Sequence, residues 1–280
     1  MAEDPAAGQA PGALTPLAPG PLLTIGTGAL SVDIAPQAGG RIAQIRCDGI
    51  EQLVGHGEYG SDAAIAWGCY PMVPWCGRIR GGRFAFEGRS YAVPPDLGDH
   101  AIHGVGFVLP WDVTGHGAEH VEMTLALPSD ERWPFGGVAT QRVSVEGRAV
   151  LLSLRVQATE RAMPASLGWH PWFRKPERLE FAPEAMYPRD GAGVTLLPAG
   201  PVRPGPWDDC FVNRREVVLH RGGQRLAVSS SCTDWVVYDA TAHATCVEPQ
   251  TSPPDSFNLQ PGRALQPGQT LEMDCMLRWD

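Results

Sequence analysis

Residues 150–157 read Val-Leu-Leu-Ser-Leu-Arg-Val-Gln, with apolar side chains at every second position from Val150 to Val156. This spacing is typical of a β-strand with one buried face, because successive side chains of a strand point to opposite sides. The same alternation covers residues 271–279 at the C-terminus, and shorter runs of it cover residues 30–34 and 121–127. Strands buried on one face only predict an antiparallel sheet.

Turn-forming residues separate these runs. The chain of 280 residues contains 33 Gly and 27 Pro, and both residue types destabilise helix interiors. No internal repeat and no Ser- or Gly-rich linker divides the sequence. We therefore expect an all-β fold, a large single-domain antiparallel β-sandwich over residues 22–280. The Ala-, Pro- and Gly-rich residues 1–21 are expected to form a flexible N-terminal tail.

The charge balance narrows the choice of partner. A net charge of −9 argues against nucleic acid and anionic membranes, because both attract basic proteins. No apolar run approaches the ~20 residues of a membrane span, and no Lys or Arg precedes Arg41, as a signal peptide would require. The 7 Cys contain no CxxC pair, which favours reduced, buried thiols. We expect a cytoplasmic protein.

Two basic segments could contact a ligand. Arg78, Arg80 and Arg83 lie within six residues, and guanidinium groups suit hydroxyls, carboxylates or phosphates; a solvated hairpin end is the alternative. His100 and His103 follow, spaced i, i+3. Because no third ligand has a suggestive spacing, a metal site is disfavoured. One of these histidines could be a donor over a pocket, or an exposed loop residue.

Two further segments could supply acid and base. His170 stands among aromatic residues in Gly168-Trp-His170-Pro-Trp-Phe173, where burial would bring its pKa into a useful range. The Trp faces, Trp172 among them, could stack on a sugar. Glu248 ends an apolar strand before a Pro-rich loop, where desolvation would raise its pKa and suit a general base. An ordinary core His and an inert rim carboxylate are the alternatives.

One His and one Glu that exchange protons, with Arg, His and Asp to hold hydroxyls, suit chemistry at a sugar hemiacetal. A base removes the proton of the anomeric hydroxyl while an acid protonates the ring oxygen, and the opened sugar recloses on either face. This reaction needs neither metal nor nucleotide, and we expect no cofactor.

These segments, in this order, resemble the aldose 1-epimerase (galactose mutarotase-like) family. The resemblance rests on short motifs that recur from about Leu22 to the C-terminus, namely Gly-Arg78-Ile, Ile-His103-Gly, Gly-Trp-His170-Pro-Trp-Phe, Trp-Asp208-Asp-Cys-Phe and Glu248-Pro-Gln250 with the later Pro-Asp255-Ser-Phe-Asn258.

The resemblance implies a β-supersandwich with the pocket on a concave sheet face. It implies His170 as the acid on the ring oxygen and Glu248 as the base on the anomeric hydroxyl. It further implies that Arg78, His103 and Asp208 bind sugar hydroxyls, and we add two neighbours of the catalytic pair, Trp172 and Gln250, to the substrate-binding residues.

Some positions depart from the family pattern, and they leave the substrate open. Gly77 replaces the usual Asn, Val105 a frequent Gly, and Trp172-Phe173-Arg174 the usual Tyr-Phe-Asn. Free hexose is the first expectation. A hexose 6-phosphate is the alternative, with Arg80, Arg83 or Arg174 holding the phosphate.

Two other classes of function stay open. A non-catalytic sugar-binding or sensing protein would bind sugar without speeding anomer exchange. A glycoside hydrolase would use Asp208 and Glu248 as its paired carboxylates. An all-β domain of this size can complete its own core, so a monomer or weak homodimer is expected.

Overall fold

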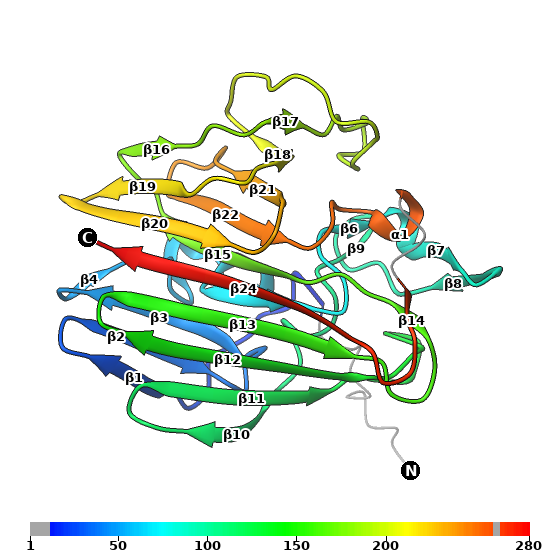
Figure 1. Ribbon diagram of the computed structural model, residues 1–280, viewed down its shortest axis with the longest axis horizontal. Coiled ribbons are helices and arrows are strands. Elements are labelled where there is room, and N and C mark those ends of the chain that lie inside the picture. The colour runs from blue at the N-terminus through cyan, green and yellow to red at the C-terminus, as the bar shows by residue number, and fades with distance from the viewer. Residues whose placement is uncertain (1–11, 260–263) are drawn as a thin grey trace, which may run out of the picture.

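Two large antiparallel sheets dominate the computed structural model, which describes residues 12–259 and 264–280 (Figure 1). Within these ranges the first sheet has ten strands, in the order β1 (Leu23–Thr27), β2 (Leu30–Ala35), β3 (Arg41–Cys47), β5 (Cys69–Met72), β15 (Gly168–Arg174), β22 (Ala244–Gln250), β21 (Asp234–Tyr238), β18 (Asp208–Val212) and β17 (Ala185–Met186), with β4 (Ile50–Glu51) beside β3.

The second sheet has eight strands in the described ranges and lies in front of the first in Figure 1. Its order is β10 (Asp112–His116), β11 (His120–Ala126), β12 (Val138–Glu146), β13 (Ala149–Gln157), β24 (Thr270–Trp279), β20 (Gln224–Ser230), β19 (Val217–Arg221) and β16 (Arg178–Glu180).

Short elements complete the described part of the fold. They are the strand pairs β6 (Arg78–Ile79) with β9 (Ala101–Ile102), β7 (Arg83–Phe86) with β8 (Arg89–Ala92) and β14 (Met163–Pro164) with β23 (Ala264–Leu265), the one-turn helix α1 (Ser256–Leu259), and the 3-10 turns η1 (Glu58–Gly60), η2 (Ala64–Ala66) and η3 (Arg80–Gly82). None of the helices in the described ranges has the length and hydropathy needed to cross a membrane.

The core between the sheets follows from the alternation in the sequence. In β13, Val150, Leu152, Leu154 and Val156 are buried, and Val150 pairs with Leu277 of β24 in register. The apolar residues at alternate positions of both strands join one large cluster with residues of the ten-stranded sheet. The predicted all-β antiparallel sandwich is therefore confirmed.

Alternation also sets which residues of the ten-stranded sheet face away from this core. On β15, Trp169 and Phe173 belong to the main core cluster, so His170 and Trp172 point to the opposite face. On β22, Val247 belongs to the core, which places Cys246 and Glu248 on the same outer face as His170. The sequence pattern of these two strands thus presents a polar set outward.

Part of the predicted tail lies against the body of the protein. Residues 1–11 are outside the described residues. In the described remainder of residues 1–21, the side chain of Ala13 is fully buried. The Ile65 amide donates to the carbonyl of Ala13 at 3.0 Å, and the Leu17 amide donates to that of Asp62 at 3.0 Å. The segment from residue 12 therefore packs beside η2.

Candidate active site

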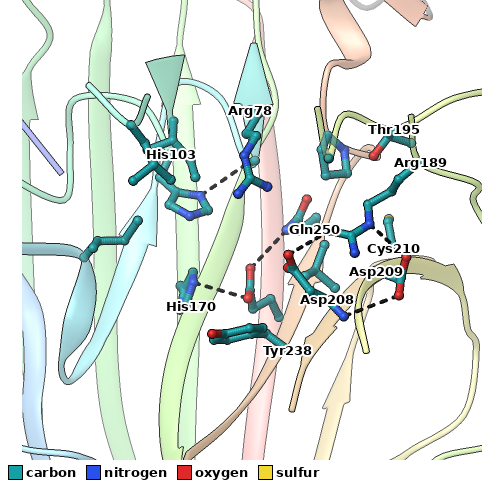
Figure 2. Close-up of a pocket in the computed structure, with 18 of the residues that line it drawn as sticks. Arg78, His103, His170, Arg189, Thr195, Asp208, Asp209, Cys210, Tyr238 and Gln250 are labelled. Atoms are coloured by element: carbon teal, nitrogen blue, oxygen red, sulfur yellow. Dashed lines mark hydrogen bonds and ion pairs between the residues drawn. The ribbon is translucent and has the colours of Figure 1, made fainter. Parts of the chain in front are cut away.

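A cavity of about 260 Å³ opens on the outer face of the ten-stranded sheet. Each sequence-predicted site residue lines it or forms its floor, and Figure 2 labels most of them. These residues are Arg78, His103, His170, Trp172, Asp208, Glu248 and Gln250. The sheet brings together the segments that carry His170, Asp208 and Glu248, because β15, β22, β21 and β18 are neighbours in it.

His170 and Glu248 are in contact at the floor of this cavity. The His170 Nε2 atom lies 3.2 Å from Glu248 Oε1, and both side chains are nearly inaccessible to solvent. Nε2 of Gln250 donates to the other Glu248 oxygen, Oε2, at 3.3 Å. The contact follows from the register, since Trp172 pairs with Cys246 and Gly168 with Gln250, which leaves His170 opposite Glu248.

Burial pushes the two groups toward their neutral forms. It lowers the pKa of His170 to about 3. It also raises the pKa of Glu248 well above its ordinary value, and the charge of Asp208 raises it further. Both shifts favour a pair that holds a single proton. The proton can sit on Glu248, with both groups neutral, or on His170, with both groups charged, and the two forms differ by one transfer across the contact.

Aromatic rings fix the orientation of His170. The ring of Tyr70, its register partner on β5, stacks on it at 4.6 Å between centroids. The Trp172 ring lies 5.5 Å away in a near-parallel orientation, and the His103 ring meets it edge-on at 5.0 Å. These apolar contacts exclude water and position Nε2 toward Glu248.

Arg78 and His103 arrive together because β6 pairs with β9. Arg78 is opposite Ile102 in this pair, so His103 is the next residue along. The His103 ring accepts a hydrogen bond at Nδ1 from the Gly77 amide at 3.3 Å, which leaves the hydrogen on Nε2. Burial holds the pKa of His103 well below its ordinary value, with the charges of His170 and Arg78 adding to the effect. A neutral His103 is thus a hydrogen-bond donor.

Arg189 is a cavity residue that sequence reasoning missed. It lies between β17 and β18, and its Nη1 contacts Asp208 Oδ2 at 2.7 Å while its Nε contacts Asp209 Oδ1 at 2.9 Å (Figure 2). Thr195 of the same segment also lines the cavity. The segment is irregular and rich in Gly and Pro, so no periodic pattern pointed to it.

The other arginines considered for a phosphate site are engaged elsewhere or lie apart. Arg80 contacts Asp190 at 2.7 Å, and Arg174 contacts Glu51 at 2.8 Å. Arg83 is exposed on β7 and is not among the residues that line the cavity. Arg78 is the cavity arginine without an ion pair to another described residue.

One group of described residues has the chemistry of metal ligands. The ligand atoms of His170, Cys246 and Glu248 all lie within 4.8 Å of one another. Two members of this group already contact each other as acid and base partners. The donor set is therefore better suited to proton exchange than to holding a metal ion.

Comparisons with known proteins identify a family for this chain. The family model described as "Aldose 1-epimerase" matches residues 21–278. The uncharacterised protein YphB of Escherichia coli strain K12 is 31% identical over 160 residues, which cover 54% of this chain and 51% of YphB. The matched region thus spans about half of that relative.

Two solved structures share the fold at low sequence identity. The GalM/aldose epimerase homologue from C. elegans superposes with a TM-score of 0.81 at 15% identity, covering 93% of this chain and 98% of that one. Galactose 1-epimerase from Lactobacillus acidophilus superposes with a TM-score of 0.77 at 16% identity, covering 92% and 94% of the two chains.

Proposed function

The chain belongs to the aldose 1-epimerase family, and from this premise we propose that it interconverts the α and β anomers of an unphosphorylated hexose. The observation that carries the proposal is the contact of 3.2 Å between His170 and Glu248 in a desolvated cavity. An acid and a base that share one proton suit a reaction in which one proton leaves the substrate while another joins it.

The proton balance of the reaction matches that of the pair. The Glu248 carboxylate takes the proton of the anomeric hydroxyl, and His170 donates the proton on Nε2 to the ring oxygen. The bond between C1 and the ring oxygen breaks and C1 becomes a carbonyl. Rotation about C1–C2 presents the other face, and the two transfers run in reverse as the ring closes.

Ring opening therefore converts the charged form of the pair into its neutral form. Burial favours this neutral form, because it raises the pKa of Glu248 and lowers that of His170. The open-chain intermediate is thus matched to the more favourable state of the pair. Ring closure restores the charged form, and no proton needs to be exchanged with solvent during the cycle.

We assign sugar binding to the remaining cavity residues. His103 offers a donor at Nε2, Arg78 offers an unpaired guanidinium, and Gln250 links to the base. The Trp172 ring lines one side of the cavity and suits the C–H face of a pyranose. These are the groups expected from the family resemblance, in one cavity.

The charges around the cavity support a neutral sugar over a sugar phosphate. Arg189 is paired with two carboxylates, and Arg80 and Arg174 are paired with acidic residues. A phosphate bound to any of these three arginines would have to displace an acidic partner at an electrostatic cost. A neutral sugar hydroxyl can instead form hydrogen bonds with an arginine or its acidic partner while the ion pair stays intact.

The test is the rate of anomer exchange in freshly dissolved glucose and galactose, followed by polarimetry or NMR exchange, with glucose 6-phosphate alongside. The wild type is compared with Glu248→Gln, and Glu216→Gln is the matched control at an exposed ion pair. We expect acceleration that Glu248→Gln reduces by about 10²-fold or more and Glu216→Gln leaves intact. Sugar binding without acceleration would contradict the proposal and indicate a sugar-binding protein.

A further inference from the structure

Arg189 and the two acidic residues that open β18 line the cavity on the side away from His170 (Figure 2). We propose that Arg189 and Asp208 together bind two adjacent hydroxyls of the sugar, so that Arg189 selects the sugar by the configuration of these hydroxyls. This inference rests on the proposed function and names a specificity-determining residue for it.

The geometry leaves both members of the pair with unused bonding capacity. Asp208 meets Arg189 through Oδ2, and its Oδ1 has no hydrogen-bond partner in the described part of the chain. Arg189 uses Nη1 and Nε for the two carboxylates, and its Nη2 group has no partner among the same residues. The pair therefore presents one free acceptor and free donors to the cavity that both residues line.

This combination fits a vicinal diol. A sugar hydroxyl can donate to the free Asp208 oxygen, and the oxygen of its neighbour can accept from Arg189. A hydroxyl of inverted configuration, or a missing one, would leave one of these polar groups without a partner. A site built to hydrogen-bond a hydroxyl discriminates strongly against an analogue that lacks it.

The charge of this cluster favours a neutral ligand. One guanidinium faces two carboxylates, and the Asp209 side chain is only 9% exposed. The cluster thus carries a net negative charge, which would repel a phosphate or carboxylate on the sugar. Hydroxyls are the ligand chemistry that remains.

Both flanks of Arg189 are held in place before any ligand binds. The Tyr187 hydroxyl donates to Asp234 at 2.8 Å, and the Tyr187 amide donates to the Cys210 carbonyl at 2.8 Å. On the other side, Asp190 accepts from the Val194 amide at 3.0 Å and pairs with Arg80 of η3. A guanidinium fixed in this way loses little entropy on binding.

The experiment measures kcat/KM for anomer exchange with glucose, galactose and the 2-, 3-, 4- and 6-deoxy glucoses. The variants are Arg189→Met and Arg189→Lys, with Arg214→Met as the control, because Arg214 pairs with Glu184 on the surface. For glucose or galactose, whichever has the higher kcat/KM with the wild type, Arg189→Met should lower kcat/KM by about 10- to 100-fold. Most of this loss should be a raised KM, as the loss of one charged hydrogen bond predicts.

The decisive result is coupling between the residue and one hydroxyl. For one deoxy sugar, the loss caused by Arg189→Met should shrink to about twofold, because the partner of Arg189 is already absent. An equal loss for every sugar would overturn the inference and assign Arg189 a structural role. If Arg189→Met does not fold, Arg189→Lys replaces it, because it keeps the positive charge. Its loss of kcat/KM should likewise shrink for that one deoxy sugar.

A second experiment separates failure of this inference from failure of the proposed function. If the wild type accelerates exchange of no sugar, the same sugars and variants are compared by equilibrium titration. Coupling between Arg189 and one hydroxyl in Kd would then support the diol site without catalysis. Equal Kd values for wild type and Arg189→Met would overturn it.

Discussion

At the scale of single residues, the environment of His170 and Glu248 changes their acid–base properties. His170 and Glu248 are ordinary residue types, but burial lowers the pKa of the first to about 3 and raises the pKa of the second. In the sequence, aromatic neighbours drew attention to His170 and a Pro-rich loop drew attention to Glu248, and the family resemblance supplied their roles, which stay predictions. Their contact was not predictable, because it depends on strand register between distant segments.

His170→Asn tests the acid at this scale. We expect the rate of anomer exchange to fall by about 10²- to 10⁴-fold, because an amide cannot protonate the ring oxygen. KM should change little, since His170 contacts the reacting atoms rather than the distal hydroxyls. NMR exchange on glucose or galactose measures both quantities.

His116→Asn is the control for His170→Asn, because His116 is exposed on β10. It should retain wild-type rates. A His170→Asn enzyme with full activity, and loss of activity in Asp208→Asn instead, would contradict the acid assignment and favour chemistry by paired carboxylates.

At the scale of elements, alternation predicted several of the strands that have one face against the core. Residues 121–127 correspond to β11 (His120–Ala126), and residues 271–279 lie within β24. The sequence was less informative for β22, in which every residue is buried, because a fully buried strand shows no period. It was silent on Arg189, because irregular segments follow no period either.

Gly104 offers a test of how an element positions a site residue. It follows His103 with a φ of +78°, and a Cβ there would overlap the carbonyl oxygen of Val73. Gly104→Ala should therefore shift the loop that carries His103. We expect a loss of about 1–3 kcal/mol in the free energy of unfolding and a raised KM for the sugar.

Gly88→Ala, in the turn between β7 and β8, is the matched control for Gly104→Ala. Gly88 has a φ of +74°, and a Cβ there would meet nothing within 4 Å. It should cost about 1 kcal/mol for its backbone conformation and leave KM unchanged. Urea unfolding and steady-state kinetics compare the two variants, and an unchanged KM in Gly104→Ala would contradict the positioning role.

At the scale of the whole molecule, the buried site should control how stability depends on pH. We expect the native pair of His170 and Glu248 to hold one proton at neutral pH, whichever residue carries it, because burial raises the pKa of Glu248 and lowers that of His170. In the unfolded chain Glu248 ionises near pH 4.3 and His170 loses its proton near pH 6.5. Above pH 6.5 the native state therefore binds more protons than the unfolded state does.

This difference gives the sign of the effect. Stability falls with rising pH wherever the native state binds more protons, by up to about 1.4 kcal/mol per pH unit for one proton. Between about pH 4.3 and 6.5 the pair adds no slope, because the unfolded chain then also holds one proton, on His170. His103 acts in the opposite direction below pH 6.5, because it stays neutral in the native state while it becomes charged in the unfolded one. Burial raises the pKa of Asp96 to about 6, so this carboxyl makes stability fall with rising pH only up to about pH 6.

We therefore expect maximal stability near pH 6.5 and a decline between pH 6.5 and 8. Glu248→Gln removes the group whose raised pKa causes this decline, so the variant should become more stable than the wild type as the pH rises, while losing activity. Urea unfolding at half-unit steps of pH measures the difference, with Glu216→Gln as the control. A wild type and a Glu248→Gln variant with parallel profiles would mean that the native pair releases its proton before neutral pH. A buried acid and base would then have gained their reactivity without a cost in stability, contrary to what their desolvation requires.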